Sequence, residues 1–196
     1  MFDQVPMLPV VIPLSAAFFL VLLCILHARH GVTLPRASVA AALAVYAGGI
    51  LANTVFPIYL DSPGSDEPQP LPLNLVPVVG YEVRDAVTNA LVFLPLGILV
   101  PLLLARPTWW RVLAITAGAS LGIEVVQFLA AGLAAGGHIA DVNDWLSNIV
   151  GGLVGYGCFT LARRQPTLAA LSDRFRWPSR ARDHSGARSR DAAPIR

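Results

Sequence analysis

Glu124 lies inside a long apolar stretch and is the residue of this sequence whose type and place most suggest chemistry. Gln127 follows it by three residues and Ser120 precedes it by four, so a helix would place all three side chains on one face. An ionisable side chain within a membrane span costs about 2.5 to 3.5 kcal/mol and usually faces a bundle interior or a functional cavity. We favour a polar pocket; the alternative is a protonated glutamate that hydrogen-bonds between helices as a structural group.

A second polar pattern follows the same stretch, with residues spaced by three, three and four positions. If the next helix begins there, these residues lie within about 120° of one another. They are His138, Asp141, Asp144 and Asn148. Asp141 alternatively serves as the N-cap of that helix, but capping does not account for Asn148, two turns further on. Asn148 has the same expected depth as Glu124 on the preceding antiparallel span, so we expect the two side chains to meet.

The other strongly polar residues within apolar stretches lie in the same half of the expected bundle. Asn89 lies near the outer end of the third stretch, and Arg84 precedes it on the same side. This distribution predicts a hydrophilic cup that opens on one side of the membrane. The candidate pocket residues are Arg84, Asn89, Glu124, Gln127, His138, Asp141, Asp144 and Asn148.

The composition indicates which elements hold these residues. Of the 196 residues, 55% are apolar and only 13% are charged, whereas a soluble domain carries about 25% charged residues. The mean hydropathy is +0.62. Five apolar stretches each approach the roughly 20 residues that cross a bilayer as a helix; they run over residues 5–26, 37–57, 86–105, 112–131 and 145–162. We predict an all-α polytopic membrane bundle of five transmembrane helices.

The arginines predict the orientation of this bundle. All 14 basic residues are arginine, and 13 of them lie between the first and second stretches, between the third and fourth, or after the fifth. Arg84 alone lies on the other side, among acidic residues. The positive-inside rule then places the N-terminus outside and the C-terminus in the cytoplasm. We expect the first stretch to be a retained span, because Asp3 precedes it and the run is too long for a signal peptide.

We expect one domain and a tail. Residues 1–164 form the transmembrane bundle, and residues 165–196 form a basic, disordered cytoplasmic tail, because seven arginines and three aspartates dominate that segment. Between the second and third stretches, residues 61–85 are rich in proline. The apolar second half of this segment, residues 71–81, is expected to lie at the interface or to fold back into the mouth of the bundle.

Four motifs carry a family resemblance. They are Asn74-Leu-Val-Pro77, Asn89-x-x-x-Phe93-x-Pro95-x-Gly97, Glu124-x-x-Gln127 and Asp141-x-x-Asp144-x-x-x-Asn148-x-x-Gly151-x-x-x-Gly155. In this order and spacing, over residues 41–161, they resemble the VanZ-like family of small membrane proteins, which is named for a member associated with teicoplanin resistance. The family usually has an arginine at the position of His138, so here a side chain that titrates near neutral pH replaces a permanent cation.

The resemblance implies a multi-pass protein of the bacterial cytoplasmic membrane that acts at the cell envelope and affects susceptibility to glycopeptides. It implies no reaction. We favour a non-enzymatic protein that binds a lipid-linked envelope ligand or a glycopeptide in the outward cup. The alternative is an enzyme that modifies an envelope lipid by carboxylate acid/base chemistry with Glu124, Asp141 and Asp144. Membrane lipids are expected partners, nucleic acid is not, no cofactor is indicated, and the oligomeric state is left open.

Other function classes have weaker support. Gly118-x-Ser120-x-Gly122 matches a serine-hydrolase pattern, but a nucleophile needs a base within reach, and His138 lies in a loop. The same histidine and the neighbouring carboxylates are plausible metal ligands without a recognised metal-site spacing. An envelope-lipid phosphatase would need several outer arginines. A proton-coupled transporter is also conceivable, but no inverted repeat is visible.

Overall fold

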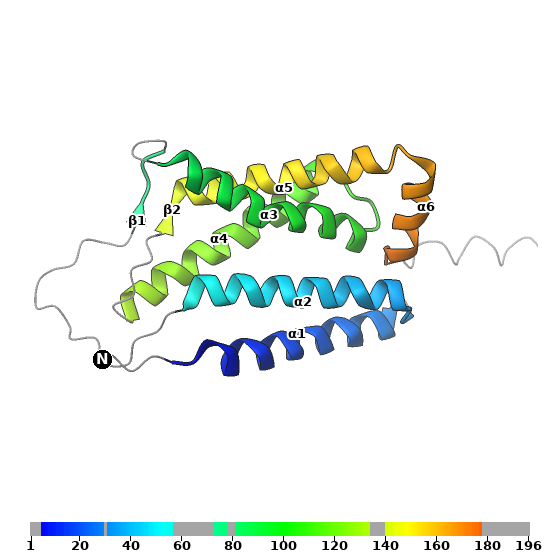
Figure 1. The fold of residues 1–196 in the computed structure, drawn as a ribbon, viewed down its shortest axis with the longest axis horizontal. Helices are drawn as coiled ribbons and strands as arrows, with labels where there is room; N and C mark the ends of the chain where they lie inside the picture. Colours follow the sequence, from blue (N-terminus) through cyan, green and yellow to red (C-terminus); the bar gives the residue numbers. More distant parts are fainter. Residues whose placement is uncertain (1–4, 30, 57–72, 78–80, 134–139, 178–196) are drawn as a thin grey trace, which may run out of the picture.

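The computed structural model describes residues 5–29, 31–56, 73–77, 81–133 and 140–177. Within these residues the chain forms six helices and two very short strands (Figure 1). In chain order they are α1 (Met7–Arg29), α2 (Leu34–Val55), β1 (Leu73–Asn74), α3 (Val83–Leu103), α4 (Trp109–Leu133), β2 (Ala140–Asp141), α5 (Val142–Ala162) and α6 (Pro166–Phe175). We call the end of the bundle with β1 and β2 the strand end, and the opposite end the α6 end.

Five of these helices are long and apolar enough to cross a membrane, as the sequence predicts: α1, α2, α3, the Trp109–Leu129 part of α4, and α5. Large apolar side chains on them point outward. Val45 on α2 and Leu91 on α3, for example, are 74% and 60% exposed. An outer surface of this kind suits surrounding acyl chains rather than water. The chain is therefore a multi-pass membrane protein.

The reversal between α1 and α2 uses a glycine. Gly31 has a φ of 75°, a left-handed conformation that costs a glycine little. Pro35 then lies in the first turn of α2, where its missing N–H is not needed. The two helices lie side by side as an antiparallel pair (Figure 1). At Gly48 a Cβ would collide with the Ser15 side chain, so a glycine is needed where α2 contacts α1.

The closest helix pair is α3 with α5, which run in the same direction from the strand end. A Cβ at Gly151 would collide with the backbone of Ala90, and one at Gly155 would collide with the carbonyl oxygen of Leu94. Gly151 and Gly155, a pair of small residues four positions apart, thus allow α5 to approach α3 closely. Phe93, only 1% exposed, lies in the apolar core that these helices share with α2 and α4.

The two strands join segments that are distant in the sequence. β1 pairs in parallel with β2, with Leu73 opposite Ala140 and Asn74 opposite Asp141. The chain preceding α3 is thereby held against the chain preceding α5. Folding back was one of the two arrangements expected for residues 71–81, of which residues 73–77 and 81 are described. The pairing brings two of the sequence motifs together at the strand end.

The segment after α5 differs from the disordered tail that we expected for residues 165–196. Pro166–Phe175 form α6, which turns across the end of the bundle towards α2 (Figure 1). Trp177 is buried to 7% exposure and packs with Leu26 of α1 and Ala40 of α2. Residues 178–196 lie outside the described residues.

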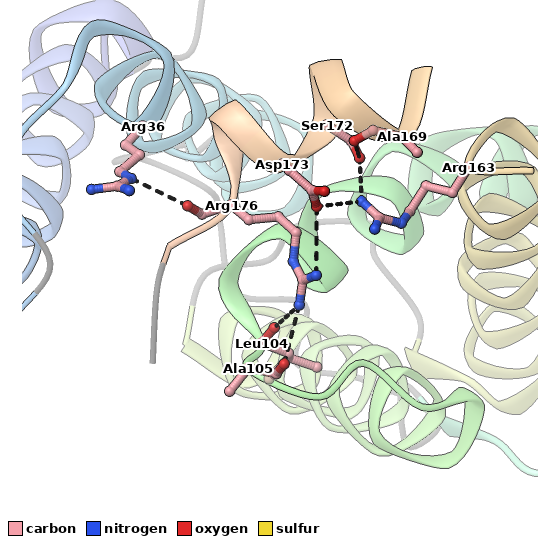
Figure 2. Close-up of polar contacts among 8 residues, drawn as sticks. All are labelled: Arg36, Leu104, Ala105, Arg163, Ala169, Ser172, Asp173 and Arg176. Carbon is pink, nitrogen blue, oxygen red and sulfur yellow. Dashed lines mark hydrogen bonds and ion pairs between the residues drawn. The ribbon is translucent and has the colours of Figure 1, made fainter. Parts of the chain in front are cut away.

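Polar contacts explain why this segment is ordered, and Figure 2 shows most of them. Arg163 donates hydrogen bonds to Ser172 and to Asp173, the latter at 2.8 Å. Arg176 donates to the carbonyl oxygens of Leu104 and Ala105, which follow α3, at 3.3 and 3.1 Å. Because a helix leaves its last carbonyl groups without intrahelical partners, these bonds anchor the segment after α6 to the end of α3.

Candidate functional site

The polar side chains near the strand end form three hydrogen-bonded sets, and each set includes α5 or its N-cap residue. Asp141 is the N-cap of α5: its Oδ1 accepts from the backbone N of Asn143 at 2.8 Å. Its Oδ2 accepts from Nδ2 of Asn74 across the strand pair, at 2.9 Å. Its own backbone N donates to Oε2 of Glu124 on α4, at 2.9 Å. One residue therefore connects β1, α4 and α5.

Asp144 makes the second set of contacts, towards α3. Its Oδ1 accepts from the Tyr81 hydroxyl at 2.7 Å and also from Nδ2 of Asn89. Asn89 donates to the Tyr81 oxygen as well, at 3.1 Å, and Tyr81 lies 3.3 Å from Oγ of Ser147. Tyr81 lies outside the membrane spans, and its partial burial raises the pKa of its hydroxyl above the ordinary 10.0. The hydroxyl therefore stays protonated and remains a donor at neutral pH.

Deeper in the bundle, Asn148 joins α5 to α4. Its Nδ2 donates to Oγ of Ser120 at 2.9 Å, and the two residues are 4% and 0% exposed. Trp145 donates from Nε1 to the carbonyl of Ala117 at 3.0 Å, one turn earlier on the same pair of helices. Asn148 and Glu124 thus face the same interface, but the hydrogen bond of Asn148 goes to Ser120, one turn from Glu124.

Two side-chain oxygen atoms of this region accept no hydrogen bond within the part of the chain that the structure describes. Oδ1 of Asn148 and Oε1 of Gln127 are both buried and have no hydrogen-bond partner there. A buried polar atom without a partner costs about 1 to 3 kcal/mol. These two amide oxygens are therefore places where a donor from outside the described residues would stabilise the protein.

The remaining candidates lie apart from this group. Arg84 is exposed in the first turn of α3, and its side chain makes no hydrogen bond or ion pair to another described residue. His138 lies outside the described residues. Among the described residues, no three His, Cys, Asp or Glu side chains are arranged to hold a metal ion. Five of the eight candidates thus take part in hydrogen bonds that join α3 or α4 to α5 or its N-cap; they are Asn89, Glu124, Asp141, Asp144 and Asn148.

Sequence reasoning missed three members of this group. Tyr81 and Ser147 are two of them, since neither is among the candidate pocket residues predicted from the sequence. The third is Asn143, which is 3% exposed and donates a hydrogen bond to the carbonyl of Val76 at 3.3 Å. It does not lie on the helix face that the spacing of Asp141, Asp144 and Asn148 defines, so the spacing does not predict it. We call the whole group the strand-end cluster: Asn74, Tyr81, Asn89, Ser120, Glu124, Gln127, Asp141, Asn143, Asp144, Ser147 and Asn148.

The chemistry of the strand-end cluster is that of hydrogen-bond acceptors. It contains three carboxyl groups, those of Glu124, Asp141 and Asp144, and their partners given above are neutral donors. The ion pairs found among the described residues are at the α6 end, between Asp173 and Arg163 or Arg176. Such a site suits a ligand that brings hydroxyl, amide or amine groups, and it disfavours an anionic group.

Comparison with known proteins identifies the family of this chain. A search of the curated proteins and a search of the solved structures each found no match. The VanZ/LLP1 family model matches residues 43–163, more than half of the chain. The match includes α3, α4, α5 and both strands, and thus every described member of the strand-end cluster. Five apolar spans, the polar motifs at their strand end and this match agree that the chain belongs to the VanZ/LLP1 family.

Proposed function

We propose that this VanZ/LLP1 family protein lies in the bacterial cytoplasmic membrane with its strand end outside. There it binds a lipid-linked envelope ligand or a glycopeptide-type ligand and so affects susceptibility to glycopeptides such as teicoplanin. The distribution of arginines supports this orientation, because eight of the nine arginines among the described residues lie at the α6 end and only Arg84 lies at the strand end. The strand-end cluster would then be reached from the outer surface.

One observation carries the proposal: a buried carboxyl group within a span, among acceptors that lack donors. Glu124 is 8% exposed. Its Oε2 accepts a hydrogen bond from Asp141, and its Oε1 has no hydrogen-bond partner among the described residues. The amide oxygens of Gln127 on α4 and Asn148 on α5 are buried and have no hydrogen-bond partner among the described residues. Burying this many acceptors is unfavourable unless donors meet them. Sugar hydroxyls and peptide amides, which both proposed ligand classes carry, are donors of this kind.

The alternative is an enzyme that modifies an envelope lipid by acid/base chemistry. The presence of three carboxyl groups in one cluster favours it. Asp141 already accepts described hydrogen bonds on both oxygens, so its part would be to position other groups. Glu124 and Asp144 each have one carboxyl oxygen without a hydrogen-bond partner among the described residues. These two side chains would therefore exchange a proton with the lipid. This alternative requires a change in the mass of a lipid, which simple binding does not produce.

The test is glycopeptide susceptibility of a sensitive host that produces each variant at matched membrane levels. Glu124→Gln keeps the shape and polarity of the side chain but cannot ionise. If the carboxylate meets the ligand, this variant should fold and insert but lose the phenotype. His138→Arg restores the usual family side chain and should preserve the phenotype while flattening its dependence on pH between about 5 and 8.

The matched control is Glu82→Gln, the same change in an exposed residue just before α3, whose side chain makes no capping hydrogen bond. It should leave the phenotype unchanged. The proposal is wrong if Glu124→Gln keeps full resistance while Glu124→Ala loses it only in proportion to protein abundance. That pattern would mean that Glu124 is a structural group between helices.

A further inference from the structure

An apolar cavity of about 370 Å³ lies between the first four helices, away from the strand-end cluster. Its wall is almost entirely apolar, with Tyr46 and Thr54 as the polar exceptions. Residues that line it include Phe18 of α1, Tyr46 and Ile50 of α2, Phe93 of α3, and Gly122 and Val126 of α4.

The cavity and the strand-end cluster use different sides of α4. Gly122 and Val126 each lie two positions from Glu124. Two residues along a helix correspond to a rotation of about 200°, so side chains at this spacing point in nearly opposite directions. Glu124 faces α5, whereas Gly122 and Val126 face the space next to α2. None of the residues that line the cavity belongs to the strand-end cluster.

The cavity is open to the medium around the bundle on its α1 and α4 sides. Phe18 is 40% exposed and Val126 is 41% exposed, and both line the cavity. Both residues lie within candidate membrane spans. The medium at this opening is therefore the hydrocarbon of the bilayer, which makes a lipid chain the most abundant molecule that can enter.

Size and polarity decide among the possible occupants. An apolar cavity excludes water, and one of about 150 Å³ already binds benzene, so 370 Å³ accommodates a longer stretch of hydrocarbon. A helix of about 10 Å diameter needs roughly 800 Å³ for each 10 Å of its length, so a helix from a second copy does not fit. Residues 178–196 carry five arginines and are too polar for this wall.

We propose that this cavity binds a single alkyl chain of a bilayer lipid, held by apolar contacts alone. The chain would fill space that otherwise leaves Phe93, Ile50 and their neighbours without contacts on one side. The Tyr46 hydroxyl is buried and has no hydrogen-bond partner among the described residues. An alkyl chain does not form a hydrogen bond with it, so removing this hydroxyl should not weaken binding of the chain. This inference is independent of the proposed function at the strand-end cluster.

Two glycines of α4 provide a matched pair of variants. A Cβ at Gly122 or at Gly118 would meet nothing within 4 Å, so a leucine at either position causes no collision with the backbone. Gly122 lines the cavity and Gly118, one turn earlier, does not. Gly122→Leu should fill the cavity, whereas Gly118→Leu adds the same side chain to the same helix without doing so.

The experiment uses the full chain in phosphatidylcholine vesicles that contain a small fraction of a phosphatidylcholine with a photoreactive diazirine in its alkyl chain. After irradiation, mass spectrometry locates the label. In the wild type, Ile50 should be labelled more than Val39, a buried residue of the same helix that does not line the cavity. Gly122→Leu should lower labelling of Ile50 about tenfold, because the new side chain replaces a similar amount of lipid hydrocarbon. Gly118→Leu should leave it unchanged.

Three results would overturn the proposal. Labelling of Ile50 no higher than that of the buried Val39 in the wild type would show that no chain is held there, and this comparison needs no variant to fold. Equal loss in Gly122→Leu and Gly118→Leu would show an effect unrelated to the cavity. Loss of labelling in Tyr46→Phe would show that a polar group of the ligand, rather than an alkyl chain, occupies the site. Ala119→Leu, also in the cavity wall, should reproduce the effect of Gly122→Leu.

Discussion

Asn148 joins two spans through one buried hydrogen bond, to Ser120 at 2.9 Å. Removing either side chain leaves the other without its partner in apolar surroundings, at a cost of about 1 to 3 kcal/mol. We therefore expect Asn148→Ala and Ser120→Ala to be non-additive, with a coupling of about 0.5 to 3 kcal/mol in a double-mutant cycle of unfolding in detergent. The coupling of Asn148→Ala with Glu124→Ala should be weaker, because those side chains have different partners.

The control for this cycle combines Asn148→Ala with Ser172→Ala. Ser172 lies on α6 at the opposite end of the bundle and accepts a hydrogen bond from Arg163. Distant sites add within about 0.3 to 0.5 kcal/mol. Additive effects of Asn148→Ala and Ser120→Ala, equal to this control within error, would contradict the proposed pairing of the two side chains.

Tyr81 makes the strand-end cluster sensitive to alkaline pH. Partial burial, together with the nearby charge of Asp144, raises the pKa of Tyr81 above 10.0. Its contribution to stability is present below pH 10 and is lost as the pH rises through the higher pKa of the folded state. An ultraviolet titration of tyrosinate should show a component above pH 10 that Tyr81→Phe removes. If Tyr81→Phe leaves the titration curve unchanged above pH 10, the hydroxyl does not have this environment.

At the scale of elements, the contact of α3 with α5 depends on glycines that have no room for a side chain. A Cβ at Gly151 would collide with the backbone of Ala90, whereas one at Gly157 on the same helix would meet nothing within 4 Å. Gly151→Ala should therefore destabilise the protein by about 1 to 3 kcal/mol. Gly157→Ala should be neutral or stabilise it by about 0.5 to 1 kcal/mol. Thermal unfolding in detergent compares the two, and equal effects would refute the close approach at Gly151.

Features that depend on local sequence could be predicted. The apolar runs predicted five spans, and capping was one of two roles foreseen for Asp141. These predictions follow from residues that are close together in the sequence. They placed the candidate carboxylates on the correct helices and at one end of the bundle.

Features that depend on distant partners could not be predicted. The strand pair joins Asn74 to Asp141 through only two residues on each side, too few to give an alternating pattern. α6 is ordered by bonds from Arg176 to carbonyl groups more than 70 residues earlier in the chain (Figure 2). Tyr81 joins the strand-end cluster because the chain before α3 is brought against α5. The polar composition of residues 165–196 predicted a disordered tail, whereas Pro166–Phe175 form α6, because the contacts that hold α6 are with distant residues.

At the scale of the whole molecule, the orientation in the membrane decides which solution the strand-end cluster faces. Reporter fusions test it directly. Fusions at Ser65 and Gly137 should report an outside location, and fusions at Thr108 and Arg190 a cytoplasmic one, because the arginines favour the cytoplasmic side. A cytoplasmic signal at Ser65 would reverse the bundle and would exclude an outward-facing ligand site.

The two proposals place ligands at separate sites, which use different residues of α4. The strand-end cluster presents buried acceptors that suit hydroxyl and amide donors, and the cavity near α2 presents an apolar wall that suits a hydrocarbon chain. Substitutions at Glu124 and at Gly122 should therefore affect different bound species. This separation allows the central claim, that the strand-end cluster binds a ligand through Glu124, to be tested by itself.

The most direct test is mass spectrometry of the molecules that copurify in mild detergent with the wild type, Glu124→Gln and Glu82→Gln. The wild type and Glu82→Gln should retain an amphiphile or glycopeptide rich in hydroxyl and amide groups, with unaltered mass. Glu124→Gln should retain about tenfold less of it, because a hydrogen bond to a charged group contributes about 1.5 to 3 kcal/mol. Equal amounts of every copurifying species in the wild type and Glu124→Gln would contradict the account.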